Sequence, residues 1–207
     1  MTRTRDATPT PNTAATDRTI ASYEAYAATY DTLVGPTLSA NTEAALRRLL
    51  AVTPPGGEIL EVGSGPGREA DFLEEAGVRV RRTDATRAFI ALQAERGKRA
   101  ELVNVIRDEL GGPYDGVLAM CVLIHVGFDQ TDAVLGKIAA SLRPGAGFLV
   151  SIREGDGETH GDYHTVYWRT ADFTARLRAA GLRVDWDAHH VDSDGDAWLT
   201  YLATRIR

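Results

Sequence analysis

Cysteine is almost absent from this sequence of 207 residues, in which Cys121 is the only one. A single cysteine excludes a disulfide within the chain and any metal site built mainly from cysteine. Lysine is also scarce, since only Lys98 and Lys137 are found among 23 basic residues. Arginine fills the other basic positions, so an individual arginine carries little functional information.

Long hydrophobic runs are missing as well. No apolar stretch approaches the roughly 20 residues that cross a bilayer, and the start of the chain is polar. We therefore expect a cytoplasmic protein without a membrane partner. The 29 acidic residues outnumber the 23 basic ones, giving a formal net charge of −6. A dedicated nucleic-acid binder usually presents a basic surface, so this balance argues against a nucleic-acid partner.

The length and the hydrophobic fraction of 43% fit one globular domain. Residues 1–17 are rich in Thr, Pro and Ala without a hydrophobic period, which predicts a disordered tail. Residues 18–207 are expected to form the domain, with cap helices over 18–52 and the core over 58–207. In the first cap helix, Tyr23, Tyr26 and Tyr30 recur every three or four residues and share one face.

From residue 58 onward, apolar runs alternate with amphipathic segments. The predicted strands cover 58–62, 78–83, 102–106, 116–121, 148–152, 183–191 and 197–206, and the predicted helices cover 68–76, 86–98, 131–142 and 171–180. Repeated strand–helix units predict an α/β fold with a doubly wound, mostly parallel sheet of seven strands. The last two strands are expected to form an antiparallel hairpin.

The first strand runs into a glycine-rich turn, Glu61-Val62-Gly63-Ser64-Gly65-Pro66-Gly67-Arg68. Glycines at alternate positions allow a sharp bend and a close approach of the backbone to a ligand. A dinucleotide fingerprint would place glycine where Arg68 stands, and Pro66 lacks an N–H that a phosphate cradle would use. No Lys-Ser/Thr pair follows, which excludes a P-loop. The turn therefore favours a nucleoside over a phosphate.

Asp84 follows the second predicted strand, 21 positions after Gly63. A carboxylate at this place can accept hydrogen bonds from both hydroxyls of an adenosine ribose. The alternative is that Asp84 caps the next helix. Glu61 belongs to a buried parallel strand, where a merely solvent-facing role is disfavoured, and we expect it to reach the amino end of the same ligand.

These features resemble class I S-adenosylmethionine-dependent methyltransferases of the small-molecule type over roughly residues 20–207. The resemblance also rests on Tyr114-Asp115-Gly116-Val117, Val122-Leu123-Ile124-His125-Val126 and Leu142-Arg143-Pro144-Gly145-Ala146-Gly147. It implies a Rossmann-like fold and S-adenosylmethionine as cofactor, released as S-adenosylhomocysteine. The cofactor-binding residues that it implies are Tyr30, Glu61, Gly63, Ser64, Gly65, Gly67, Arg68, Asp84, Ala85, Asn104, Val105 and Cys121. Asn104 would contact the adenine amino group, with Asp108 as a competitor.

The resemblance places the methyl acceptor near His125, which follows the fourth strand. Histidine titrates near neutral pH and can take a proton, so His125 is the candidate catalytic base, and packing at a helix end is the alternative. The Tyr30-Asp31 pair resembles a pair in the helices that cover such active sites. The candidate substrate-binding residues are Tyr23, Tyr26, Glu154, His160, Tyr163 and His164.

Four of these residues belong to a long glycine-rich segment after the fifth strand, 153–164, which is expected to be a lid or a solvated loop. No metal is expected, because its histidines and carboxylates match no tight ligand spacing. The predicted function is methyl transfer to an O or N atom of a small-molecule metabolite, with natural-product tailoring as its setting, by a monomer or homodimer.

Two alternatives remain open. The first is a protein that binds the cofactor without transferring its methyl group. The second is an NAD-dependent oxidoreductase, which Arg68 in the place of glycine disfavours. Methylation of nucleic-acid amines is disfavoured too, because Met120-Cys121-Val122-Leu123 stands where that subclass carries an Asn/Asp-Pro-Pro-aromatic motif.

Overall fold

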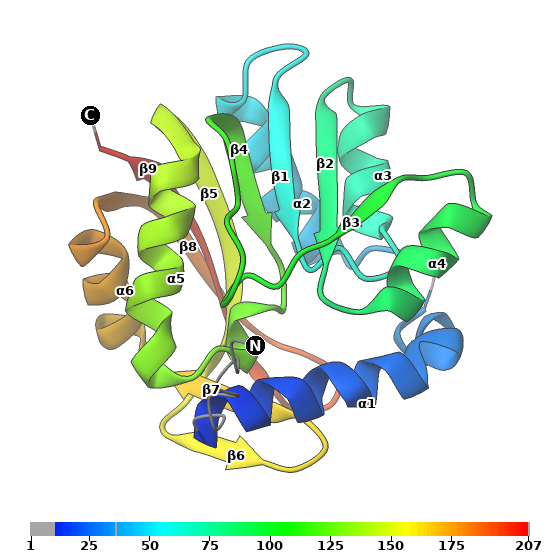
Figure 1. The fold of residues 1–207 in the computed structure, drawn as a ribbon. Helices are drawn as coiled ribbons and strands as arrows, with labels where there is room; N and C mark the ends of the chain where they lie inside the picture. Colours follow the sequence, from blue (N-terminus) through cyan, green and yellow to red (C-terminus); the bar gives the residue numbers. More distant parts are fainter. Residues whose placement is uncertain (1–10, 36, 207) are drawn as a thin grey trace, which may run out of the picture.

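The computed structural model describes residues 11–35 and 37–206 (Figure 1). Its helices are α1 (Pro11–Val34), α2 (Ala40–Val52), α3 (Arg68–Glu75), α4 (Arg87–Glu95), the 3-10 turn η1 (Leu123–His125), α5 (Phe128–Ser141) and α6 (Thr170–Ala179). Its strands are β1 (Glu58–Val62), β2 (Arg79–Asp84), β3 (Ala100–Leu102), β4 (Tyr114–Ala119), β5 (Leu142–Glu154), β6 (Glu158–His160), β7 (His164–Trp168), β8 (Leu182–Val191) and β9 (Ala197–Arg205).

The central sheet has the predicted doubly wound α/β arrangement. Strands β3, β2, β1, β4 and β5 lie side by side and parallel in that order. Strand β9 pairs antiparallel with β5, and β8 pairs antiparallel with β9. These seven strands are those that the sequence predicted, including the terminal hairpin, so the predicted fold class is confirmed.

The segment 153–164 is ordered into strands rather than the expected lid or solvated loop. After β5 ends, β6 and β7 form an antiparallel hairpin, with His160 opposite His164. Strand β7 also continues the sheet, pairing parallel with the last two residues of β5, Arg153 and Glu154. Val166 and Trp168 are buried on one face of β7, and this apolar face anchors the hairpin to the core.

Other boundaries also differ from the predictions, among them those of α1 and β3. Helix α1 begins at Pro11, so the expected disorder of residues 11–17 is wrong, while residues 1–10 lie outside the described part. Packing explains the difference, because Ala15 and Thr16 are buried. Strand β3 ends at Leu102 instead of Ile106, since the Asn104 side chain accepts a hydrogen bond from the Ile106 N–H at 2.9 Å and turns the chain.

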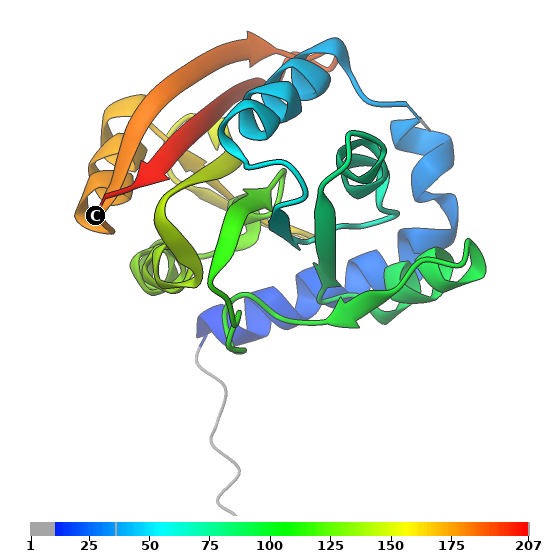
Figure 2. The same cartoon turned by 90° about the horizontal axis from the view of Figure 1, so that it is seen from above.

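The core lies on both faces of the sheet because alternate strand residues point in opposite directions. On one face, Ile59 and Leu118 pack with Leu46 and Leu49 of α2 and Leu73 of α3. On the other face, a larger apolar cluster reaches α5 and α6. Figures 1 and 2 show α2 and α3 on one side of the sheet and α5 and α6 on the other. Among the described residues, no helix is long and apolar enough to cross a membrane.

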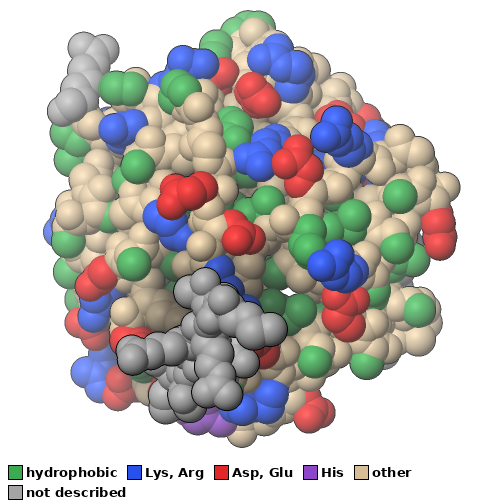
Figure 3. Space-filling view, viewed as in Figure 1, with side chains coloured by type: hydrophobic (Ala, Val, Ile, Leu, Met, Phe, Trp, Pro, Cys, Tyr) green, Lys and Arg blue, Asp and Glu red, His purple; other side chains and the backbone are tan. Residues whose placement is uncertain are grey.

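Helix α1 crosses the end of the sheet at which the parallel strands finish (Figures 1 and 2). Glu24 holds it there, because its two carboxylate oxygens accept the N–H groups of Arg87 and Ala88 at 2.7 and 2.9 Å. These N–H groups belong to the first turn of α4 and have no partner within that helix. The carboxylate therefore acts as a cap supplied by another helix and fixes α1 over the strand ends. Figure 3, viewed from the same direction as Figure 1, shows acidic and basic side chains interspersed over the face turned to the viewer.

Candidate active site

The glycine-rich turn between β1 and α3 has the backbone that only glycine adopts easily. Gly63 and Gly65 have φ of +68° and +50°, in the left-handed region. A Cβ on Gly63 would lie 2.3 Å from a methyl carbon of Val122, so this glycine allows the backbone of the turn to pack against the Val122 side chain. A Cβ on Gly65 would meet nothing within 4 Å. The turn is thus packed tightly on one side and open on the other.

Asp84 ties the end of β2 to this turn. Its carboxylate, on a residue 6% exposed, accepts the Gly65 N–H at 2.8 Å through one oxygen and the Thr86 N–H at 2.8 Å through the other. The second bond lies at the start of α4, so the helix-capping alternative is realised in part. The Ala85 N–H and the Thr86 hydroxyl also hydrogen-bond to this carboxylate. Burial raises the pKa of Asp84 above its ordinary value.

Two polar residues that were not predicted from the sequence, Gln93 and Arg82, hold the glycine turn through hydrogen bonds. Gln93 is fully buried, and its amide donates to the Ser64 hydroxyl at 2.7 Å and to the Gly65 carbonyl at 2.8 Å. The amide oxygen of Gln93 accepts from Arg82 at 3.1 Å, and Arg82 is paired with Asp71 at 2.7 Å. Their signal was weak, because Arg82 on a strand and Gln93 on a helix are ordinary surface residue types.

Three carboxylates gather around the turn: Glu61, Asp84 and Glu69, the last of which was not predicted. Glu61 is 2% exposed, and one of its carboxylate oxygens is buried without a hydrogen-bond partner. Burial is the largest cause that raises the pKa of Glu61 well above its usual range, and the neighbouring Glu69 adds to it. Burial also raises the pKa of Glu69. Because burial disfavours the ionised form of these carboxyls, a ligand that brings a positive charge to the cluster is favoured over one that brings a phosphate.

Arg68 and Tyr30 meet at the mouth of this region. The Arg68 guanidinium donates to the Gly35 carbonyl and lies 5.8 Å from the centre of the Tyr30 ring. The Tyr30 ring packs edge-on against Phe89, with centroids 5.2 Å apart. Burial raises the pKa of Tyr30 to about 12. Arg68 thereby links α3 to the end of α1, while the side chain of Asp31 lies outside the described part.

The remaining residues of the predicted cofactor-binding set differ in whether their side chains are free to contact a ligand. The side-chain oxygen of Asn104 accepts the Ile106 N–H within its own turn, and the backbone N–H of Asn104 donates to the Asp108 carboxylate at 2.8 Å. The two alternatives for the adenine contact are therefore hydrogen-bonded to each other. Val105 is 7% exposed and packs in the core. Ala85 is partly buried between Asp84 and the start of α4.

Cys121 occupies a special backbone position just beyond β4. It is the only non-glycine residue with positive φ (+58°) in the described part, and its N–H donates to the Ser151 hydroxyl at 2.8 Å. The residue is solvent-accessible, yet the surrounding protein desolvates the thiol and raises its pKa to about 11. The raised pKa disfavours the thiolate, so Cys121 does not have the properties of an activated nucleophile.

His125 lies on η1 between two hydrogen-bond partners. Its Nδ1 is 2.6 Å from the His164 carbonyl oxygen, and its Nε2 is 2.9 Å from the Tyr23 hydroxyl. Because a carbonyl can only accept, the ring proton is on Nδ1, and Nε2 presents a lone pair to Tyr23. Burial is the main cause that lowers the pKa of His125 to about 4. His125 is therefore a neutral acceptor at physiological pH.

An aromatic cavity opens beside this pair. Its volume is about 530 Å³, and it is lined by Ser22, Tyr23, Ala25, Tyr26, Tyr30, Asp162 and Tyr163. The Tyr23 and Tyr163 rings are 4.8 Å apart, and Tyr163 lies 6.2 Å from the His125 ring. The structure thus brings three predicted substrate residues, Tyr23, Tyr26 and Tyr163, together next to His125.

The other three predicted substrate residues lie elsewhere. Glu154 accepts from the Thr170 hydroxyl at 3.1 Å and contacts His189 at 2.6 Å. His160 and His164 stack on each other on the β6–β7 hairpin, where Glu158 contacts both. His164 reaches the site only through its backbone carbonyl. The prediction that no metal is bound rested on spacing along the chain, which did not reveal this cluster.

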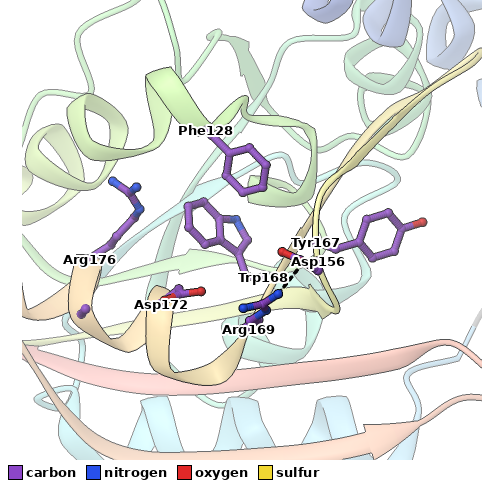
Figure 4. A pocket seen from close by; sticks show the side chains of 8 residues that line it. Phe128, Asp156, Tyr167, Trp168, Arg169, Asp172 and Arg176 are labelled. Atoms are coloured by element: carbon purple, nitrogen blue, oxygen red, sulfur yellow. Dashed lines mark hydrogen bonds and ion pairs between the residues drawn. The ribbon is translucent and has the colours of Figure 1, made fainter.

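A second cavity, of about 340 Å³, lies between the start of α5, the end of β7 and α6 (Figure 4). Trp168 forms its floor, with Phe128 packed edge-on at 4.7 Å between ring centroids and Arg176 on the other side. Its charged residues Arg169 and Arg176 are paired with Asp156 and Asp132. None of the residues around His125 or the glycine turn lines this cavity, so we do not assign the chemistry to it.

Comparison with known proteins supports the class that this geometry suggests. Residues 60–148 match a family model described as a methyltransferase domain. The matched residues, fewer than half of the chain, include the glycine turn and support the predicted resemblance to class I S-adenosylmethionine-dependent methyltransferases. A search of the curated proteins found no match.

Solved structures with the same fold are numerous. The 1,6-didemethyltoxoflavin-N1-methyltransferase of Burkholderia thailandensis, solved with 1,6-didemethyltoxoflavin and S-adenosylhomocysteine, has a TM-score of 0.79 at 21% identity, covering 98% of this chain and 93% of that one. The CcbJ methyltransferase of Streptomyces caelestis has a TM-score of 0.73 at 18% identity, covering 88% and 96%. Magnesium protoporphyrin IX methyltransferase of Synechocystis PCC 6803, with bound S-adenosylmethionine, has a TM-score of 0.65 at 14% identity, covering 96% and 86%.

Proposed function

We propose that this protein transfers the methyl group of S-adenosylmethionine to an O or N atom of a small, uncharged, aromatic metabolite. The observation that carries the proposal is the pairing of Tyr23 with the unprotonated Nε2 of His125 at the wall of an aromatic cavity. A hydrogen-bond acceptor at this position suits an acceptor molecule that must lose a proton. The named activity of the Burkholderia relative, methylation at N1, is an example of the nitrogen case.

The residues around the glycine turn fit S-adenosylmethionine better than a dinucleotide. S-adenosylmethionine supplies an electrophilic methyl carbon on a positively charged sulfur. The buried, unpartnered oxygen of Glu61 suits an ammonium donor, and the open side of Gly65 leaves room for a ligand against the backbone. Asp84 would hold the ribose hydroxyls. The same three carboxylates would repel the pyrophosphate of NAD, which disfavours the oxidoreductase alternative.

The low pKa of His125 limits how it can act. A base whose conjugate acid has a pKa of about 4 cannot remove the proton of a neutral hydroxyl in advance. The acceptor becomes strongly acidic as its bond to the methyl carbon forms, and a weak base is then sufficient. In our proposal the Tyr23 oxygen receives this proton while the Tyr23 proton passes to Nε2 of His125. The packed tyrosines exclude water and orient the ring of the acceptor.

Cofactor binding is tested by calorimetry with S-adenosylmethionine, S-adenosylhomocysteine and NAD. We expect the first two to bind and NAD not to bind. Asp84→Ala should weaken the binding of S-adenosylhomocysteine by about 1.5–3 kcal/mol, as expected for the loss of charge-assisted hydrogen bonds. Asp187→Ala serves as the control, because it removes a carboxylate from strand β8, away from the glycine turn. Unchanged affinity in Asp84→Ala would exclude the ribose role.

Methyl transfer is tested separately, by following S-adenosylhomocysteine formation with a panel of phenols and aromatic N–H compounds. His125→Gln and Tyr23→Phe should lower turnover and leave cofactor affinity nearly unchanged. If the wild-type protein binds the cofactor tightly but produces no S-adenosylhomocysteine with any acceptor, the non-methylating alternative is favoured. Full activity of His125→Gln would assign that residue to packing.

A further inference from the structure

The β6–β7 hairpin carries a cluster of metal-ligating side chains outside the site described above. His160 lies directly opposite His164 in the antiparallel register, and Glu158 is two residues before His160. Residues two apart on a strand, and residues opposite each other across a strand pair, point to the same face of a sheet. The fold therefore places two imidazoles and one carboxylate side by side, although four and six residues separate His164 from the other two along the chain.

The potential ligand atoms are already close together. Glu158 contacts Nε2 of His164 at 2.8 Å through one oxygen and Nε2 of His160 at 3.3 Å through the other. The ligand atoms of the three residues all lie within 4.8 Å of one another. Ligands bonded at about 2.0–2.1 Å with tetrahedral angles are about 3.3 Å apart, so the present separations need only small adjustments.

Burial fixes one ligand and leaves the others free to adjust. The His164 side chain is 2% exposed, and its Nε2 is directed at Glu158. The His160 side chain is 50% exposed and is stacked nearly parallel on His164, with an interplanar angle of 7°. The Nε2 lone pairs of two parallel rings cannot point to the same ion, so one of the two histidine rings must rotate out of the stack to bind it. His160 is exposed enough to make that rotation, and solvent can complete the coordination on its side.

We propose that Glu158, His160 and His164 bind one divalent transition-metal ion of the zinc type. Two imidazole nitrogens and one carboxylate oxygen suit Zn²⁺, Co²⁺ or Ni²⁺, whereas Mg²⁺ and Ca²⁺ prefer oxygen ligands throughout. The bound ion would join β6 to β7 close to the turn. Figure 1 shows this hairpin beneath the first turns of α1.

The site has a direct connection to His125. The backbone carbonyl of His164 accepts the Nδ1–H of His125, and the backbone N–H of His164 donates to the Thr19 hydroxyl of α1 at 2.9 Å. An ion that fixes His164 therefore also fixes the group that sets the tautomer of His125. This places the ion in a structural role, one residue away from the aromatic cavity lined by Tyr163.

The test uses the full chain without an affinity tag, freed of metal by a chelator. Co²⁺ is added and followed by its visible absorption, and Zn²⁺ binding is measured by calorimetry. We expect one ion per chain and the absorption of four-coordinate Co²⁺. His160→Ala and Glu158→Gln should each weaken Zn²⁺ binding at least about tenfold, because both remove a direct ligand. His190→Ala, on strand β8, is the control and should bind as the wild type does.

Two outcomes would overturn the proposal: no saturable binding to the wild-type protein, or equal affinity in His160→Ala and His190→Ala. Thermal unfolding gives a second measurement, because Zn²⁺ should raise the Tm of the wild type and of His190→Ala but not that of His160→Ala. The partly exposed ligands are chosen for substitution, since removal of the buried His164 would disturb folding. Neither measurement depends on a methyl acceptor, so failure here is distinct from failure of the proposed methyl transfer.

Discussion

The depressed pKa of His125 predicts a specific dependence of stability on pH. In the folded protein, burial lowers this pKa from 6.5 to about 4, whereas in the unfolded chain the residue titrates near its ordinary value. Between these two values the unfolded chain binds more protons than the folded one. The free energy of unfolding therefore falls as the pH falls through this window.

The magnitude follows from the two pKa values. Near pH 7.5 both states carry a neutral His125, and the contribution is close to zero. Near pH 5 the unfolded chain is protonated at this residue and the folded protein is not, which costs about 2 kcal/mol. Below about pH 4 both states are protonated and the loss is complete.

The assay is urea unfolding of the wild type and of His125→Gln at about pH 7.5 and about pH 5. Other groups titrate in both proteins, so the quantity to compare is the difference in free energy of unfolding between them. We expect this difference to change by about 2 kcal/mol in favour of the variant on acidification. His190→Gln gives the change caused by removing a histidine outside the site. A difference independent of pH would refute the buried, neutral state of His125.

Three further predictions concern the turn, the cap helix and the thiol. Gly63→Ala should lower the free energy of unfolding by at least about 1 kcal/mol, because its Cβ would overlap Val122 in a left-handed backbone; thermal melting measures this. Glu24→Gln should cost about 0.5–1 kcal/mol by weakening a charged helix cap, whereas Glu43→Gln, in an exposed pair, should cost less in the same urea titration. Cys121 should react slowly with iodoacetamide at neutral pH, and labelling as fast as in the unfolded chain would contradict its raised pKa.

The parts of the fold that follow from local pattern were predictable. The run of apolar residues in β1 and the glycine turn after it fix a strand, a bend and a helix, and β1 has the predicted bounds 58–62. The terminal hairpin was also readable, since alternation surrounds an Asp- and Gly-rich turn. These signals lie within a few residues of one another, which is why the sequence alone contains them.

The parts that depend on contacts distant in sequence were not predictable. Gln93 supports the glycine turn from 28 residues away, and Glu24 caps a helix 63 residues later. The β6–β7 hairpin was missed because its glycines suggested a loop, whereas the buried face of Val166 and Trp168 decides its structure. Around the aromatic cavity, the helix spacing selected Tyr23, Tyr26 and Tyr30, and the segment after the fifth strand supplied Tyr163. Glu154, His160 and His164 needed their three-dimensional partners to be placed.

Helix α1 contributes to the site in two ways. It supplies much of the cavity wall, through Tyr23 and Tyr26, and it also supplies the hydroxyl that bonds to His125. A movement of this helix that opened the cavity to a metabolite would also separate Tyr23 from His125. In the proposed mechanism, the proton path from Tyr23 to His125 is therefore complete only while α1 lies over the strand ends.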